Sequence, residues 1–375
     1  MKILIAPGAF KHSLSANSAA QAMARGLRRA LPEAELVLSP IADGGNGTLD
    51  AFLASGGERV TVAGVYDPLL RPIAADYGLL DDGQTAVIEM ALASGLELLT
   101  AEERDPMAAT TYGTGQLLLH ALERGARRFI IGLGGSATVD GGSGCIQALG
   151  VRLLDANGQS TPPGGGGLAQ LARIDTTRLD SRWREAEVII ATDVDNPALG
   201  QNGAAAIFGP QKGASPEQVA RLETNLRHFF TVVRDQLGVD VMNARGGGAA
   251  GAFAAGLITF LGGRCESGID LILRQANFAA QLQNTDLVIT GEGQIDTQTL
   301  QGKGPIGVAC LAREYGVPTV AIVGGLAVDD AWLHEAGIQA ALPIVIAPMP
   351  LAEALQYAEE LVERAALRLG YLLQI

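Results

Sequence analysis

Short apolar runs alternate with stretches of helical character along most of the chain, and this alternation limits the possible folds more than any other feature. Most of the runs are continuously apolar, as expected for strands that are covered on both faces. The predicted strands lie at 2–6, 36–40, 129–133, 188–192, 287–290, 319–323 and 341–346. The predicted helices lie at 16–30, 113–124, 216–237, 271–282, 305–315 and 351–370. Strands and helices in this order predict an α/β fold built on a mostly parallel sheet.

The length of the chain and one irregular region predict a second domain. A chain of 375 residues exceeds what one ordinary hydrophobic core accommodates. Between 60 and 90 the apolar residues alternate with polar ones, and the sequence DDG at 81–83 is typical of a hairpin turn. We therefore expect an antiparallel sheet here, opening a second domain that is inserted into the first. The glycine-rich stretch 162–171 is expected to form a mobile surface loop of that inserted domain.

Composition and charge exclude several classes of protein. The 49 glycines among 375 residues are nearly twice the usual share of ~7%, and they gather where apolar runs end and a backbone can approach a ligand closely. The net charge of −13 argues against nucleic acid or an anionic membrane as partner. Cys145, Cys265 and Cys310 form no C-x-x-C pattern, so neither a disulfide framework nor a cysteine zinc site is expected. Without a signal-peptide pattern or an apolar run of ~20 residues, the chain is expected to be a soluble, cytoplasmic protein with no membrane partner.

The glycine turn after the strand at 129–133 is the strongest local signal for ligand binding. The segment FIIGLGGSATVDGGSG places Gly134, Gly135, Ser136 and Thr138 directly after a buried strand. Backbone N–H groups of such a turn can converge on a phosphate, and the hydroxyl groups can complete the cradle. The alternative is a tight turn between strand and helix that binds nothing.

The same segment also allows a dinucleotide-binding interpretation. Gly132, Gly134 and Ala137 match the spacing of the G-x-G-x-x-G/A fingerprint, and Asp155 follows at a suitable distance. The glycines at 141–142 interrupt the helix that this fingerprint requires. The P-loop pattern G-x-x-x-x-G-K-[ST] does not occur in the sequence, so a Walker-type nucleotide site is not predicted.

Two other glycine-rich segments contain carboxylates. Asp43 lies in ADGGNGT, and Glu292 and Asp296 lie in TGEGQID after the strand predicted at 287–290. Carboxylates at the end of a strand suit Mg²⁺ that is held partly by protein and partly by phosphates. The alternative is that these acids form turns and cap helices.

Five further residues are candidates for catalysis or substrate binding. Asp193 follows the apolar run VIIAT, where a carboxylate can accept the proton of a substrate hydroxyl, and Asn196 could orient it. Lys212 in FGPQKGA and Lys11 in FKHS lie on short loops from which an ammonium group can reach an anion. For each of these the alternative is a capping acid or a surface lysine. Glu89 in IEMALASG can cap a turn or line a cleft.

These segments together resemble the type I glycerate kinase family, in the same order and over essentially the whole chain. The matching stretches are FKHSLSA, PIADGGNGT, IEMALASGLEL, RDPMAATTYGTG, GLGGSATVDGG, TDVDNPALG, GPQKGAS, GAAGAFAAGL, SGIDLIL, VITGEGQIDTQTLQGKGPIGVA and VGG. The resemblance implies an ATP-dependent phosphotransfer to an alcohol group of D-glycerate with Mg²⁺, giving 2-phosphoglycerate. It also implies a small-molecule substrate as the partner, with a homodimer among the allowed assemblies.

The fold implied by the resemblance has two domains with the active site in the cleft between them. One is a discontinuous Rossmann-like domain with a parallel sheet, at 1–61 and 283–375, with 105–150 as a further candidate part. The other is a mixed α/β domain inserted at 62–282.

The roles implied for the site residues follow from this arrangement. Lys11, Asp43 and Glu89 are expected to bind the substrate. Asp193 is expected to act as the general base with Asn196 beside it. Lys212 is expected to be catalytic as well, by offsetting the charge that develops during transfer. The residues expected at the ATP phosphates are Gly134, Gly135, Ser136 and Thr138, and those expected at the metal are Glu292 and Asp296. Which acid acts as base and which holds metal stays open.

The sequence departs from the family pattern at five positions. Gly8 and Ala9 stand where an Asp-Ser pair is common, Asn46 where an acid is common, Val139 where a polar residue is common and Gln294 where Arg is common. Two other functions remain as alternatives: an NAD(P)-dependent oxidoreductase of small hydroxy acids, and a non-catalytic sensor that binds sugar acids.

Overall fold

The chain forms two units, each with its own sheet and core. The computed structural model describes residues 1–10, 12–42, 44–54, 56–296, 299 and 304–375. Unit 1 comprises Met1–Asp43, Asp50–Ser55 and Gly268–Ile375, and unit 2 comprises Gly44–Leu49 and Gly56–Ser267. The short helix α2 (Thr48–Leu53) lies where the chain passes from one unit to the other.

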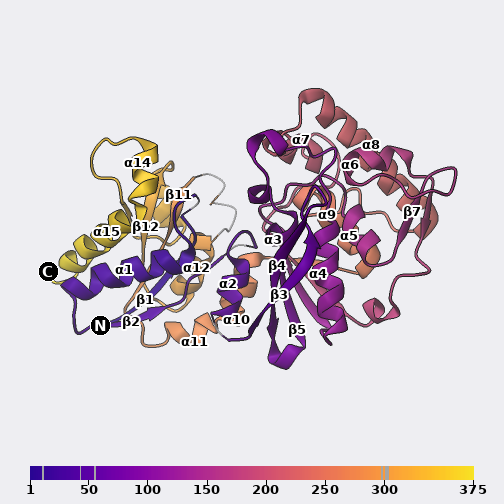
Figure 1. Ribbon diagram of the computed structural model, residues 1–375. Coiled ribbons are helices and arrows are strands. Elements are labelled where there is room, and N and C mark those ends of the chain that lie inside the picture. Colours follow the sequence, from indigo (N-terminus) through magenta and orange to yellow (C-terminus); the bar gives the residue numbers. More distant parts are fainter. Residues whose placement is uncertain (11, 43, 55, 297–298, 300–303) are drawn as a thin grey trace. The chain divides into compact units, whose positions relative to one another are not determined.

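A five-stranded parallel sheet forms the centre of unit 1 (Figure 1). Its strands, in spatial order, are β13 (Ala340–Pro343), β12 (Thr319–Leu326), β11 (Leu287–Ile295), β1 (Lys2–Pro7) and β2 (Glu35–Leu38). From β1 the chain passes to β2 on one side of the sheet and later to β11 on the other. The strand order therefore reverses between β1 and β11, the position at which open α/β sheets bind their ligands.

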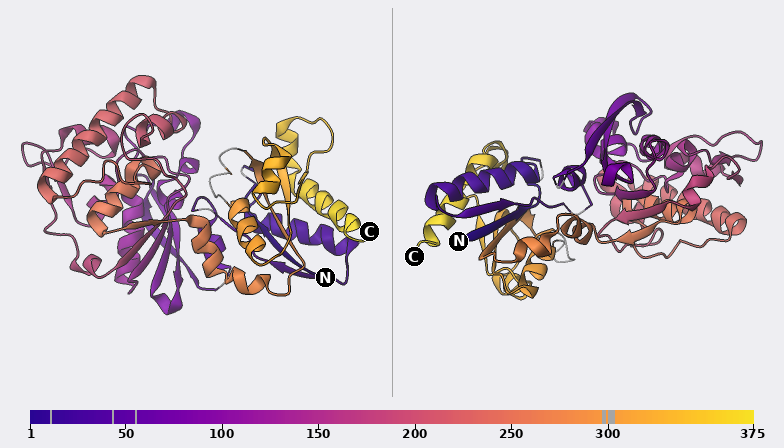
Figure 2. Two further views of the ribbon diagram at one scale, coloured as in Figure 1. Left: turned by 180° about the vertical axis from the view of Figure 1, so that it is seen from behind. Right: turned by 90° about the horizontal axis from the view of Figure 1, so that it is seen from below.

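Helices cover both faces of the unit 1 sheet, because successive side chains of each strand point to opposite faces. On β12, Ile322 packs against α1 and α15, whereas Ala321 and Val323 pack against α12 and α13. The view from below shows the indigo α1 and the yellow α15 on one side of this sheet (Figure 2). The helices of this unit are α1 (Ala16–Ala30), α10 (Gly268–Gln275), α11 (Phe278–Leu282), α12 (Gly304–Glu314), α13 (Asp330–Glu335), α14 (Leu351–Gln356) and α15 (Ala358–Leu372).

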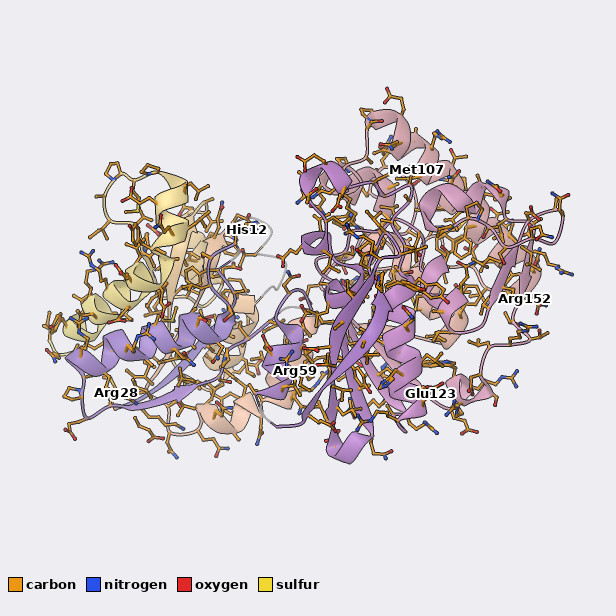
Figure 3. All side chains as sticks on the ribbon, in the orientation of Figure 1. His12, Arg28, Arg59, Met107, Glu123 and Arg152 are labelled. Carbon is orange, nitrogen blue, oxygen red and sulfur yellow. The ribbon has the colours of Figure 1, made fainter. Side chains whose placement is uncertain are left out.

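Helices α1 and α15 lie side by side along their length (Figure 1). Gly26 of α1 makes this approach possible, since a Cβ atom there would lie 2.1 Å from the carbonyl oxygen of Glu363. Arg25 joins the two helices at the surface through Glu359 and Glu363. The outer face of α1 carries exposed charges such as Arg28 (Figure 3).

A six-stranded mixed sheet forms the centre of unit 2. Its strands, in spatial order, are β10 (Arg264–Glu266), β9 (Glu187–Ala191), β6 (Arg128–Gly132), β5 (Thr85–Glu89), β4 (Pro72–Leu80) and β3 (Glu58–Tyr66). The pairs from β10 to β5 are parallel, and the β5–β4 and β4–β3 pairs are antiparallel. A separate two-stranded antiparallel sheet consists of β7 (Arg152–Leu154) and β8 (Arg173–Asp175).

The hydrophobic clusters that stabilise unit 2 include two formed by described residues. One packs the central strands against α4 and α9, with Phe129 and Trp183 in ring contact at 4.7 Å. The other lies under the long helix α8, around Phe229 and Phe230. The helices are α3 (Ala91–Ser94), α4 (Tyr112–Glu123), α5 (Ser143–Ala148), α6 (Gly164–Gly167), α7 (Ala204–Phe208), α8 (Pro216–Leu237) and α9 (Ala249–Leu261). Among all helices of the described residues, none is both long and apolar enough to cross a lipid bilayer.

The observed units differ from the expected domain boundaries in four places. Residues 44–49, expected in the first domain, belong to unit 2. Strand β3 begins at Glu58, so residues 56–61 belong to unit 2. Helices α10 and α11 belong to unit 1, where the side chain of Ile269 packs on Gly307 of α12. The segment 105–150 lies wholly in unit 2, because β6 pairs with β5 and β9.

The glycine-rich stretch 162–171 is not an exposed loop but contains α6, whose glycines are mostly buried. The N–H group of Gly166 donates to the carbonyl of Met107 at 2.8 Å. A Cβ atom on Gly165 would lie 2.3 Å from the carbonyl oxygen of Val139. The glycines therefore allow backbone to pack directly on backbone, which composition alone does not distinguish from a flexible loop.

Candidate functional site

The glycine turn after β6 packs against the segment 44–49 of the same unit. The N–H group of Gly134 donates to the carbonyl of Gly44 over 2.9 Å. A Cβ atom on Gly134 would lie 2.3 Å from the Cα atom of Gly45, and one on Gly135 would lie 2.2 Å from Oδ1 of Asn46. Two glycine turns that are distant in the sequence thus meet at the carboxyl end of β6. The N–H group of Gly134 is already bonded to the carbonyl of Gly44, so it does not act as the phosphate donor that we expected. Gly134 instead allows the two turns to approach closely.

Glu89, at the end of the neighbouring strand β5, holds the segment 44–49 in place. Its side chain is 4% exposed and accepts hydrogen bonds from the N–H groups of Gly47 at 3.1 Å and Leu49 at 3.0 Å. Both carboxylate oxygens bond to backbone at the start of α2, which gives Glu89 a positioning role. Its expected contact with the substrate stays a prediction.

Asp140 is the buried acid of the glycine turn and fixes its second half. Its carboxylate accepts four hydrogen bonds, from the N–H and hydroxyl groups of Thr111 and from the N–H groups of Gly142 and Gly144. Complete burial raises the pKa of Asp140, and the four hydrogen bonds oppose that rise. The carboxylate thus orients the turn from within the protein and does not face solvent.

Lys212 is buried next to the same turn. It ends the short 3-10 helix at Pro210–Lys212, its exposed fraction is 2%, and its ammonium group donates to Ser136 Oγ and to the carbonyl of Thr138, each at 2.7 Å. Burial lowers the pKa of Lys212 to about 7, while the charge of Asp140 acts in the opposite direction. The sequence interpretation allowed a lysine that reaches a phosphate or one at the surface; the structure instead shows a buried lysine bonded to the turn.

Ser136 and Thr138 differ in how accessible they are. Ser136 is 8% exposed, whereas Thr138 has no exposed surface. Thr138 Oγ1 is buried and has no hydrogen-bond partner in the part of the chain that the structure describes. Leaving a buried hydroxyl unpaired is unfavourable by ~1–3 kcal/mol. The complete burial of Thr138 therefore opposes its expected contact with a phosphate, whereas Ser136 is partly exposed.

Asp193 follows β9, the strand that pairs in parallel with β6. Asp193 and the glycine turn therefore lie at the same edge of the unit 2 sheet. Asn196, expected to orient Asp193, donates from its side-chain amide to the carbonyl of Asn202 at 2.8 Å. That hydrogen bond closes a local loop, and the orientation of Asp193 by Asn196 stays a prediction. The intervening Asp195 pairs with Arg245 through two hydrogen bonds of 2.8 Å.

Glu292 and Asp296 lie in unit 1, at the carboxyl end of β11 where the strand order reverses. Thr299 links them: its hydroxyl donates to Glu292 Oε1 at 2.8 Å, and its N–H group donates to Asp296 Oδ1 at 3.3 Å. Two carboxylates suit Mg²⁺, which is usually held by one or two carboxylates together with water and substrate phosphates. No cluster of three or more candidate ligands occurs among the residues with described positions, so a metal cage made by protein alone is not indicated there.

Lys11 and Asp43, the remaining predicted substrate-binding residues, lie outside the described residues. Lys11 follows β1 by four positions, and β1 is the strand next to β11.

The dinucleotide interpretation of the glycine turn does not agree with the structure. The fingerprint requires a helix that starts within the glycines, but α5 begins only at Ser143. Asp155, the expected ribose ligand, instead accepts hydrogen bonds from the N–H groups of Asn157 and Gln159 in an exposed turn.

One element of the site was not identified from the sequence as a candidate. Residues Ala250, Gly251 and Ala252, at the start of α9, have left-handed backbone conformations with φ of 54°, 69° and 64°. The N–H group of Gly141 donates to the carbonyl of Gly251 at 3.0 Å. Only the run of small residues at 246–252 signals this backbone in the sequence.

Comparison with known proteins gives a consistent result. The profile of the Glycerate kinase family matches residues 3–374. A glycerate kinase of Bacillus subtilis is 47% identical over 98% of this chain and 96% of its own length. A glycerate 2-kinase of Escherichia coli is 46% identical over 100% and 98%. A chain from Salmonella typhimurium LT2 with a known crystal structure has a TM-score of 0.86 and 44% identity, covering 100% of this chain and 98% of its own.

Proposed function

The chain belongs to the glycerate kinase family, and from this we propose that it transfers the γ-phosphoryl group of ATP to a hydroxyl group of glycerate. The observation that carries the proposal is the family match across residues 3–374, which includes both the glycine turn after β6 and the acids at the carboxyl end of β11. The enzyme is a phosphotransferase with an alcohol group as acceptor. Neither the oxidoreductase nor the non-catalytic sensor has support from the relatives.

The glycine turn after β6 is the proposed site for the ATP phosphates. Ser136 accepts a hydrogen bond from Lys212, so its own hydroxyl hydrogen is available for an anionic oxygen. The positive charge of Lys212 and the glycine backbone at Gly135 favour an anion at this turn. Phosphoryl transfer depends mainly on positioning and on neutralising charge, and this turn is suited to both.

Asp193 is the proposed general base. Its place at the end of a buried strand limits the directions in which the carboxylate can point, as a residue that accepts a proton from a bound hydroxyl requires. We assign the base to Asp193 from its position after β9, at the same edge of the unit 2 sheet as the glycine turn.

Glu292 and Asp296 are the proposed ligands of Mg²⁺. When bound, the metal ion would supply positive charge that neutralises the phosphates. Thr299 bonds to both carboxylates and so fixes the separation between two oxygen ligands. Binding of the substrate by Lys11 and Asp43, the formation of 2-phosphoglycerate and a homodimeric assembly stay predictions.

An assay of ADP release tests the proposed function. Purified protein, Mg²⁺ and ATP are combined with D-glycerate, L-glycerate, lactate, glycolate or tartrate, and ADP formation is followed through a coupling enzyme. We expect ADP release to depend on D-glycerate and to exceed the rate with the other acids. Equal rates with and without any hydroxy acid would contradict a glycerate kinase. A parallel titration with NADH, followed by nicotinamide fluorescence, should show no binding.

A further inference from the structure

The carbonyl group of Thr138 is held from two sides by elements that are far apart in the sequence. On one side the ammonium group of Lys212 donates to it at 2.7 Å. On the other side lies Gly251, where a Cβ atom would come within 2.1 Å of the same oxygen and within 2.5 Å of the Cα atom of Val139. The backbone of Gly251 therefore packs directly on the peptide that follows Thr138.

Gly251 belongs to a stretch of backbone that is unfavourable by itself. The left-handed conformation of Ala250 and Ala252 brings their Cβ atoms close to backbone carbonyls, and consecutive residues of this kind are rare. The surrounding structure maintains it through hydrogen bonds: Ala252 N–H donates to Gly248 at 3.2 Å, and Gly248 N–H donates to Asn196 at 2.9 Å. The stretch thereby joins the loop after Asp193 to the glycine turn.

We propose that Lys212 and the left-handed segment Ala250–Ala252 are positioning elements that clamp the Thr138 peptide and so fix Ser136 for the ATP phosphates. This inference rests on the proposed function, because it gives the clamped turn its ligand. Lys212 acts through Ser136 and Thr138 and does not itself touch the nucleotide. A fixed turn binds phosphates without reorganising, which is how preorganised donors contribute most to phosphoryl transfer.

The hydrogen-bonding capacity of Lys212 matches this role. A neutral amine has two N–H donors, and the structure gives Lys212 two acceptors, Ser136 Oγ and the Thr138 carbonyl. Both hydrogen bonds therefore persist when the amine loses its proton. A lysine that worked by contact with the phosphate would instead need its charge.

Gly251→Ala and Gly262→Ala provide a matched test. Gly251 lies in the first turn of α9 and Gly262 is the C-cap that follows its last residue, with similar left-handed φ angles of 69° and 65°, but a Cβ atom on Gly262 meets nothing within 4 Å. Both variants thus impose the same backbone strain, and only Gly251→Ala displaces Thr138. A displacement of ~1 Å at a reacting group can lower the rate about 10²-fold. We expect ADP affinity, measured by calorimetry, and kcat/KM for ATP to fall at least tenfold in Gly251→Ala and to stay within twofold in Gly262→Ala.

The Michaelis constants separate positioning from general damage. In Gly251→Ala the KM for ATP should rise while the KM for glycerate stays within about threefold, because Thr138 lies in the turn proposed for the phosphates. Equal effects of the two alanine substitutions, or equal rises in both Michaelis constants, would overturn the inference. If the wild-type protein shows no glycerate-dependent turnover, the proposed function fails, and the ADP affinities still decide this inference.

Lys212→Met keeps the test valid if Gly251→Ala does not fold. Methionine fills a similar volume without a donor, so ADP affinity should fall as in Gly251→Ala. If both substitutions act on the Thr138 carbonyl, the double variant should lose no more affinity than the weaker-binding single variant. Losses that multiply would show two independent effects and would contradict a common clamp. An ADP affinity of Lys212→Met equal to that of the wild-type protein would also contradict the clamp.

Discussion

Lys212→Met should change how the stability of unit 2 depends on pH. Burial lowers the pKa of Lys212 from 10.5 to about 7, so between these values the unfolded chain binds a proton that the folded chain lacks. The free energy of unfolding of the wild-type protein therefore rises with pH in this window, and below pH 7 the full cost of the buried charge is present. With one pKa unit equal to about 1.36 kcal/mol, the rise relative to the variant between pH 7 and pH 9 is about 2 kcal/mol.

Urea unfolding followed by tryptophan fluorescence measures this difference. Trp183 lies in the core of unit 2, and Trp332 lies in α13 of unit 1, so a Trp332→Phe background restricts the signal to unit 2. The comparison needs the variant at each pH, because burial also raises the pKa of Cys145. Because folding keeps the Cys145 thiol protonated, the free energy of unfolding falls as the pH rises through the usual pKa range of a thiol. This effect is the same in the wild-type protein and the variant, so it cancels when their free energies of unfolding are subtracted. A wild-type minus variant difference that stays constant from pH 7 to pH 9 would refute the burial of a titrating lysine.

Three further substitutions test separate parts of the site. Asp193→Asn should lower kcat about 10²–10⁴-fold while ADP affinity changes little; a well-folded variant with normal kcat would remove Asp193 as the base. Asp296→Asn should raise the Mg²⁺ concentration needed for half-maximal rate, and an unchanged Mg²⁺ dependence at full activity would exclude Asp296 from the metal site. Asp140→Ala leaves four buried donors without their acceptor, so the free energy of unfolding of unit 2 should fall by about 3 kcal/mol or more. A loss below about 1 kcal/mol would contradict the role of Asp140 in holding the turn.

The sheet strands were predictable because their signal is local. Runs such as 129–133 and 188–192 are almost continuously apolar, and the structure places β6 and β9 there as neighbouring buried strands. The helix at 16–30 was predicted with its observed bounds, since Ser15 caps its start and Pro32 follows its end. The helix expected at 271–282 is instead two helices, because Asn277 takes a left-handed conformation between them.

The side-chain roles at the site were less predictable because they depend on partners distant in the sequence. The acceptors of Lys212 lie more than 70 positions away, so its burial leaves no local trace in GPQKGA. Glu89 likewise binds backbone about 40 positions away. The segment Ala250–Ala252 has a composition that favours right-handed helix, and only packing against the glycine turn imposes the left-handed one.

Product analysis with enolase tests the central claim most directly. The protein is incubated with Mg²⁺, ATP, D-glycerate and an excess of enolase, and phosphoenolpyruvate is followed by its ultraviolet absorbance. Enolase dehydrates 2-phosphoglycerate but not 3-phosphoglycerate, so the signal reports both transfer and the carbon that receives the phosphoryl group. We predict phosphoenolpyruvate in an amount equal to the ADP released, with none when D-glycerate is omitted. ADP release that is independent of D-glycerate, with no phosphoenolpyruvate even after addition of phosphoglycerate mutase, would contradict the assignment.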